Sequence, residues 1–197
     1  MAKWIKLLLS CVLTCMLLAS CKTSAESGSD ASTVIVGGKV GAAIAVKMKQ
    51  LRATIPASAT TVETINRGEG LKATILSSQL FAPNSNRLTD SAMSTLTDLA
   101  AALNGYPDTN IRIVAHTDKT GEDELNRKLS ERRAMSVGKA LTDSGLDAAR
   151  LKCEGRGFNE PKADNSTREG RALNRRVEIF ITPSAKMIDE ARRKPAQ

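Results

Sequence analysis

The feature that most constrains the fold is an ordered alternation of strand-like and helix-like segments between Leu71 and Thr182. Four short stretches carry apolar residues at the two-residue period of a β-strand, namely residues 71–76, 110–115, 151–157 and 176–182. Two longer stretches carry apolar residues at helical spacing, namely residues 90–103 and 122–144, and a short helix is expected within 165–174. The resulting order, β-α-β-α-β-(short α)-β, predicts an α+β two-layer sandwich: a mixed β-sheet with two long helices on one face.

Composition sets the broad class of the protein. The chain has 197 residues, of which 41% are hydrophobic, and this is enough for one core with appendages. Only 3% of the residues are aromatic, which argues against a stacking platform for single-stranded nucleic acid, and we expect no nucleic-acid partner. The formal charge of +8 is modestly basic and selects no partner by itself.

The first twenty residues are typical of a secretion signal. Lys3 and Lys6 precede an apolar stretch of about a dozen residues, which is too short to span a membrane. The stretch 18–21, Leu-Ala-Ser-Cys, resembles the lipobox of bacterial lipoproteins. This resemblance implies cleavage before Cys21, acylation of Cys21, and, with Lys22 following, a lipid-anchored position at the outer membrane that faces the periplasm. The alternative is an ordinary signal peptide with a coincidental cysteine.

The remaining cysteine and histidine content offers little chemistry. Once residues 1–20 are removed and Cys21 is acylated, Cys153 is the one thiol left, so no intramolecular disulfide is expected. Its strand-like surroundings favour a buried small hydrophobe over a nucleophile. His116 is the single histidine, and we expect it to order a loop. We therefore expect no metal site, no other cofactor and no enzymatic activity.

Composition predicts which segments lie before and after the main domain. A signal peptide at 1–20 precedes a flexible Ser/Ala/Gly-rich tether at 21–33 and a Gly/Ala-rich helical segment with linker at 34–70. In that segment Gly37, Gly41 and Ala45 form a stripe of small residues, which suits either a helix lying on the domain or the bilayer surface, or self-association. A short strand is expected at 61–65. The main domain covers 71–183 and a basic tail covers 184–197.

Several motifs between residues 80 and 181 occur together in a recognisable order. They are Leu80-Phe81 with Leu88, His116-Thr117-Asp118-x-x-Gly121, Asn126-x-x-Leu129-Ser130-x-x-Arg133-Ala134-x-x-Val137, Gly155-x-Gly157-x-x-x-Pro161, and Gly170-Arg171-x-x-Asn174-Arg175-Arg176-Val177-Glu178. In these motifs the chain resembles the C-terminal domain of the OmpA family, which includes Pal and the periplasmic domain of MotB. The resemblance implies non-covalent binding of peptidoglycan through the meso-diaminopimelate of its stem peptide, without cleavage.

The resemblance maps the ligand-binding pair onto Asp118 and Arg133. A free amino-acid end of diaminopimelate presents an ammonium beside a carboxylate, and an aspartate with an arginine complements these two charges. Asn126 and Ser130 share a helical face with Arg133. We expect Asn126, Ser130 and Thr117 to complete a polar rim, Phe81 and Leu129 to form a wall, and Arg176 to be peripheral.

Other readings remain open at this stage. An aspartate after a strand often caps a turn, and a helical arginine is usually solvated. A peptidoglycan hydrolase would need a metal cluster or an activated nucleophile. A degenerate domain acting only in protein contacts is a third possibility. The chain also carries Ala82 where the family commonly has an aspartate after the phenylalanine, and it gives no indication of oligomeric state.

Overall fold

The computed structural model describes residues 35–56 and 61–194. The expected signal peptide, Cys21 and the tether lie outside these residues. The elements, in chain order, are α1 (Gly38–Thr54), β1 (Thr61–Ile65), η2 (Asn66–Gly68), β2 (Gly70–Leu76), α2 (Ser77–Leu80), α3 (Asp90–Asn104), β3 (Thr109–Ala115), α4 (Asp123–Asp143), η3 (Ala148–Arg150), β4 (Leu151–Gly155), α5 (Arg168–Asn174), β5 (Arg176–Pro183) and α6 (Ala185–Arg193).

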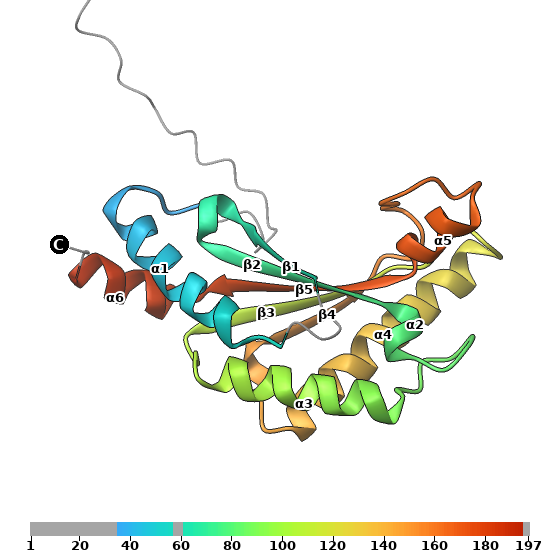
Figure 1. Cartoon of the computed structure of the whole chain (residues 1–197), viewed down its shortest axis with the longest axis horizontal. Coiled ribbons are helices and arrows are strands. Elements are labelled where there is room, and N and C mark those ends of the chain that lie inside the picture. Colours follow the sequence, from blue (N-terminus) through green and yellow to red (C-terminus); the bar gives the residue numbers. More distant parts are fainter. Residues whose placement is uncertain (1–34, 57–60, 195–197) are drawn as a thin grey trace, which may run out of the picture.

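The five strands form one mixed sheet in the order β1-β2-β5-β3-β4. Strands β3 and β4 are parallel, and the other neighbouring pairs are antiparallel. Helices α3 and α4 lie together on one face of this sheet (Figure 1). The expected α+β sandwich with a mixed sheet and two long helices on one face is therefore confirmed. The short strand expected at 61–65 is β1, which extends the sheet at the β2 edge.

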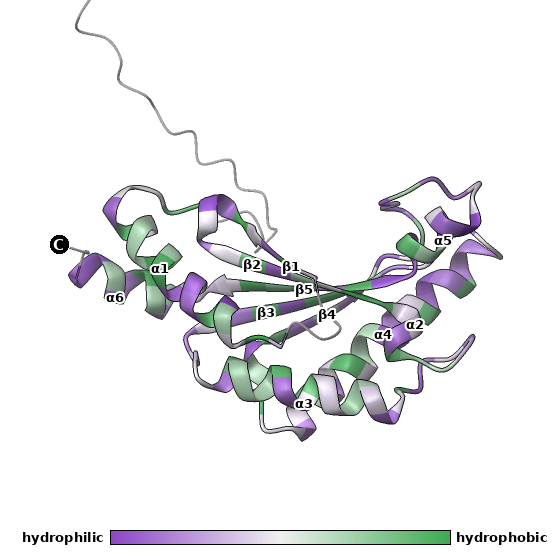
Figure 2. Cartoon of the chain, viewed as in Figure 1, coloured by the Kyte–Doolittle hydropathy of each residue, from purple (hydrophilic) through white to green (hydrophobic). Residues whose placement is uncertain are grey.

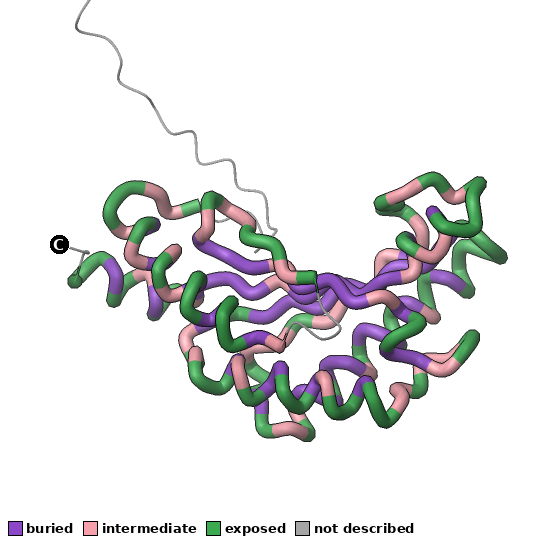
Figure 3. The backbone as a smooth tube through the Cα atoms, viewed as in Figure 1, coloured by how far each residue is buried: buried purple, intermediate pink, exposed green. Residues whose placement is uncertain are grey.

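The hydrophobic core lies between the sheet and the helices. Alternate residues of β2, β5 and β3 point into it and are almost fully buried, namely Leu71, Ala73, Ile75, Val177, Ile179, Ile181, Ile111 and Ile113. Leucines 96, 99 and 103 of α3 and Leu141 of α4 meet them from the helical layer. Figure 2 shows hydrophobic residues recurring along the strands and helices, and Figure 3 shows the central strands buried and the outer helix turns exposed.

Helix α1 packs onto this same core. Its Ile44, Met48 and Leu51 are fully buried. The stripe of small residues faces the η2 turn, because a Cβ added at Gly41 would clash with the Glu69 carboxylate, and one at Gly68 would lie 3.4 Å from the Ala45 Cβ. The stripe thus serves a contact within the chain, with the helix lying on the domain.

The buried carboxylate of Glu69 fixes the start of α1. It accepts hydrogen bonds from the backbone N–H groups of Val36, at 2.5 Å, and Gly37, at 2.7 Å. Helix α6, from the expected basic tail, lies beside α1 at the end of the molecule away from α5 (Figure 1), and buries Met187 and Ala191. Among the described helices, none combines the length and the hydropathy needed to cross a bilayer.

Candidate functional site

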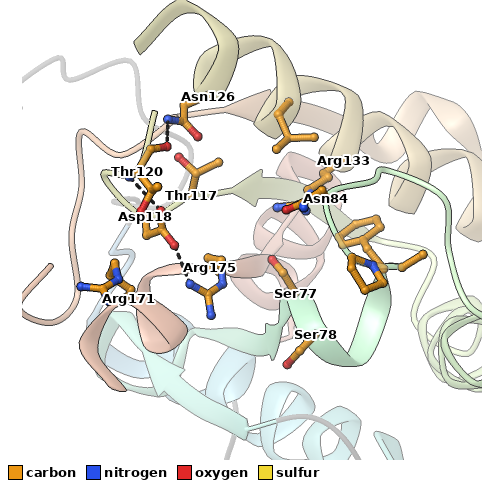
Figure 4. Close-up of a pocket in the computed structure, with 14 residues that line it drawn as sticks. Ser77, Ser78, Asn84, Thr117, Asp118, Thr120, Asn126, Arg133, Arg171 and Arg175 are labelled. Carbon is orange, nitrogen blue, oxygen red and sulfur yellow. Dashed lines mark hydrogen bonds and ion pairs between the residues drawn. The ribbon is translucent and has the colours of Figure 1, made fainter. Parts of the chain in front are cut away.

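A pocket of about 600 Å³ opens at the end of the sheet that carries α2 and α5, opposite the α1–α6 end (Figures 1 and 4). It forms where loops leave the strands and meet the first half of α4. Its lining is Ser77, Ser78, Phe81, Ala82, Pro83, Asn84, Thr117, Asp118, Thr120, Asn126, Leu129, Arg133, Arg171 and Arg175. Segments separated by almost one hundred residues therefore share this one cavity.

Asp118 lies in the loop that leaves β3 and is 8% exposed. Its Oδ1 accepts the Thr120 backbone N–H at 2.9 Å, and its Oδ2 accepts a hydrogen bond from Arg175 Nη1 at 2.5 Å. Burial on its own would raise the pKa of Asp118. The hydrogen bonds from Arg175 and Thr120 outweigh burial and hold the pKa below the ordinary value, so the carboxylate is ionised at neutral pH.

Arg133 reaches the same pocket from α4. Its Nε donates to the Ser85 carbonyl at 3.0 Å, and its guanidinium lies 5.2 Å from the centre of the Phe81 ring. Burial lowers the pKa of Arg133, and the nearby positive charge of Arg175 acts in the same direction, although an arginine remains charged at neutral pH. Figure 4 shows Arg133 across the pocket from Asp118. Among the described residues, Asp118 takes Arg175 as its ion-pair partner and leaves Arg133 facing the cavity.

The structure brings most of the predicted set together. Phe81, Thr117, Asn126 and Leu129 line the pocket with Asp118 and Arg133. Asn126 donates from Nδ2 to the Thr120 carbonyl at 2.9 Å, which ties α4 to the Asp118 loop. The Thr117 hydroxyl is buried and has no hydrogen-bond partner among the described residues.

The prediction for Ser130 needs a correction, because this residue is absent from the pocket lining. It is fully buried, and its Oγ accepts the Gly157 N–H at 2.9 Å while donating to the Arg127 carbonyl at 2.8 Å. Ser130 shares a helical face with Arg133, but its hydroxyl contacts the loop after β4, and Ser130 does not line the cavity. Ser130 therefore fastens a loop and does not contribute to the rim.

Arg176, expected at the periphery, lies outside the pocket. Its Nε donates to Glu178 Oε1 at 2.8 Å, and its Nη2 donates to the Glu160 carbonyl at 3.2 Å. His116, which is 1% exposed, places Nε2 3.7 Å from the other oxygen of Glu178. These contacts join β5 to the end of β3 directly behind the Asp118 loop.

Six polar residues of the pocket lining were not among the predicted site residues: Ser77, Ser78, Asn84, Thr120, Arg171 and Arg175. Arg175 follows α5 and belongs to a motif in which its neighbour Arg176 received attention. The available signal was the pair Arg175-Arg176 itself, since consecutive residues at the start of a strand point to opposite sides, and only one of the two can be peripheral.

The chemistry of the pocket is that of a binding site for a small charged group. One carboxylate and three guanidinium groups surround the cavity, and Phe81, Leu129 and Ala82 supply an apolar wall. An arginine can hold a ligand carboxylate through two parallel hydrogen bonds, and a buried aspartate can hold an ammonium. The arrangement therefore complements a ligand that carries both charges on a short aliphatic chain.

Comparison with known proteins identifies the family. The profile described as OmpA family matches residues 80–175. The chain is 38% identical to the probable lipoprotein YiaD of Escherichia coli, over 75% of this chain and 67% of that protein. It is 42% identical to the outer-membrane lipoprotein YfiB of Pseudomonas aeruginosa, over 58% of this chain and 68% of that protein.

A solved structure shows the same architecture. It is the structure of the cell wall anchor of the T6SS from Pseudomonas aeruginosa, which is 34% identical to this chain, with a TM-score of 0.60 over 69% of this chain and 96% of that one. This chain is therefore similar to a solved structure in fold as well as in sequence. The match of the family profile, the identity with YiaD and YfiB, and the shared fold together establish that the chain belongs to the OmpA family.

Proposed function

We propose that the pocket binds peptidoglycan non-covalently, by gripping the free amino-acid end of meso-diaminopimelate in a stem peptide, and that it does not cleave it. The observation that carries the proposal is the placement of Asp118 and Arg133 on opposite sides of one cavity, with each charge held in place by other groups. A zwitterion with adjacent ammonium and carboxylate groups complements such a pair.

The hydrogen-bond arrangement leaves capacity for this ligand. Asp118 Oδ1 accepts the Thr120 backbone N–H and Oδ2 accepts a hydrogen bond from Arg175, and the two oxygens of a carboxylate together offer about four acceptor positions, so an ammonium donor can still be bound. Arg133 uses Nε for the Ser85 carbonyl, so its two terminal nitrogens can grip a carboxylate. Phe81 and Leu129 flank the space between them and can pack against the methylene chain of the ligand.

Two attachments, one to the outer membrane and one to the cell wall, would let this protein link the two layers. An acyl anchor on Cys21 would hold the protein at the outer membrane, facing the periplasm, while the pocket holds the wall. The names of two similar proteins, an outer-membrane lipoprotein and a cell wall anchor, support this arrangement. Confinement near the wall raises the local concentration of ligand, so a modest affinity at a single site is sufficient.

Co-sedimentation with purified sacculi tests the proposal. We expect the Asp118→Ala and Arg133→Ala variants to lose binding while their circular dichroism spectra remain unchanged. Arg132→Ala is the matched control, because Arg132 neighbours Arg133 on α4 but is exposed. Full binding by either folded site variant would contradict the proposed site, and release of soluble muropeptides by the wild type would contradict binding without cleavage.

Competition identifies the ligand group. Free meso-diaminopimelate should displace the protein from sacculi, whereas Nα-acetyl-lysine amide, whose side chain ends in an ammonium with no carboxylate beside it, should displace it more weakly. Equal displacement by both compounds would count against recognition of diaminopimelate.

A further inference from the structure

The pocket has more positive charge than one zwitterion can complement. Asp118 faces Arg133, Arg171 and Arg175, so a neutral amino-acid end leaves an excess of two positive charges. Ala82, which lines the same cavity, adds no charge to it. The excess positive charge of this pocket therefore calls for a further anionic group on the ligand.

The excess charge is concentrated on the α5 side. Figure 4 shows Arg171 and Arg175 beside each other, across the cavity from Arg133. Arg171 uses Nη1 for the carbonyls of Asn165 and Ser166, both at 2.9 Å, and among the described residues its other nitrogens form no hydrogen bond. Arg175 donates a hydrogen bond from Nη1 to Asp118, and its side chain remains 42% exposed.

Ser77 adds an uncharged donor on the other side of Arg175 from Arg171 (Figure 4). Its backbone N–H donates to the Arg175 carbonyl at 2.9 Å, which holds Ser77 beside that arginine. Ser77 is 4% exposed, and among the described residues its hydroxyl is buried with no hydrogen-bond partner. A buried hydroxyl without a partner is costly unless another group satisfies it, and here it lines the cavity.

We infer that Ser77, Arg171 and Arg175 form a second subsite, which takes a carboxylate of the stem peptide other than the one gripped by Arg133. The inference rests on the proposed function and specifies the class of stem that binds well. Two carboxylates of a stem can fill the subsite: that of the acylated centre of diaminopimelate, when the stem ends there, and the α-carboxylate of the preceding γ-linked glutamate.

Isothermal titration of the full-length acylated protein in detergent micelles, with three synthetic peptides, tests the inference. The parent is L-Ala-γ-D-Glu-meso-diaminopimelate. One analogue carries an amide at the acylated diaminopimelate centre, and the other carries an amide on the glutamate α-carboxylate. We expect one analogue, and not the other, to bind about tenfold more weakly than the parent, since an amide removes a charge-assisted hydrogen bond without changing the shape.

Variants connect this loss to the subsite. The Ser77→Ala and Arg171→Gln variants should bind the parent peptide more weakly. In both variants the difference in affinity between the parent and the sensitive analogue should shrink to about twofold or less. Ser77→Ala removes only a hydroxyl, so it remains informative if Arg171→Gln loosens the 165–166 loop. Arg168→Gln, an exposed arginine at the start of α5, is the matched control and should keep the full difference.

The outcomes separate the two proposals. If the parent and both analogues bind with equal affinity, and Asp118→Ala abolishes binding of all three, the second subsite is wrong and the proposed function stands. If none of the peptides binds the wild-type protein, the proposed function itself fails. An amide effect that is unchanged in both Ser77→Ala and Arg171→Gln would place the second carboxylate elsewhere.

Discussion

The carboxylate of Asp118 pairs with the guanidinium of Arg175, which lies 57 residues later in the chain, and Arg133 stands across the pocket from it. Asp118 is thereby kept ionised without neutralising Arg133, whose own position is fixed by the Ser85 carbonyl. Two opposite charges are thus held apart, and both are pre-organised for a ligand that bridges them.

Replacing Arg175 should make binding sensitive to pH. The pKa of Asp118 is lowered in the folded protein, so wild-type binding to sacculi should stay constant from pH 7 to about pH 5. In Arg175→Gln the main partner that lowers this pKa is lost, so binding should weaken about tenfold at pH 7 and decline further at a higher pH than in the wild type. Co-sedimentation across the pH range measures both effects, and coincident pH profiles would contradict the role given to Arg175.

Glu178 should contribute to stability only above acidic pH. Burial opposes its ionisation, but His116 and Arg176 beside it prevail and lower the pKa of Glu178 from 4.5 to about 2. A lowered carboxyl pKa gives stability that is complete above 4.5 and is lost as the pH falls toward 2. Glu178→Gln should therefore cost about 2 kcal/mol at pH 7. Urea unfolding should show this difference shrinking below pH 4.5, and a difference independent of pH would refute the explanation.

Gly41 and Glu69 should be energetically coupled. Glu69→Ala removes the acceptor of two backbone N–H groups at the start of α1 and should cost about 1–3 kcal/mol. Gly41→Ala should destabilise as well, because its Cβ would displace the Glu69 carboxylate. In the Glu69→Ala background the clash is gone, and Gly41→Ala should instead stabilise by up to about 1 kcal/mol through helix propensity. Additive effects in this double-mutant cycle would exclude the coupling.

Ser130→Ala should separate stability from binding. The change leaves the buried Gly157 N–H without its acceptor and should cost about 1–3 kcal/mol of unfolding free energy. Because Ser130 lies outside the pocket lining, affinity for sacculi should change by less than about twofold. A large loss of affinity with little loss of stability would return Ser130 to the binding site.

The sequence predicted the main elements well because their signals are local. Periodicity in residues 71–76 and 110–115 matched strands β2 and β3, and helical spacing over residues 90–103 matched α3. Thr89 accepts the Ala92 N–H, as a helix-capping residue should. Such features depend on neighbours within a few residues, so one sequence is enough to read them.

Pairing across the sheet was harder to read. Strand β5 inserts between β2 and β3, and this brings Arg175 beside Asp118 and Ser77. Helical spacing likewise grouped Ser130 with Arg133, although Ser130 contacts the loop after β4 and does not line the cavity. Strand order and loop paths depend on contacts between distant segments, which a periodicity in the chain does not encode.

By itself, the sequence determined the α+β class, the order of the main elements and the OmpA-family motifs that contain Asp118 and Arg133. Local hydrogen bonding and alternating burial fix these features, and both leave a trace in adjacent residues. Only the tertiary structure decided which cation pairs with Asp118, that Ser130 fastens a loop, and that the small-residue stripe of α1 makes room for Glu69. Each of those outcomes depends on the position of a side chain from elsewhere in the chain, and that position is set by the packing of the whole domain.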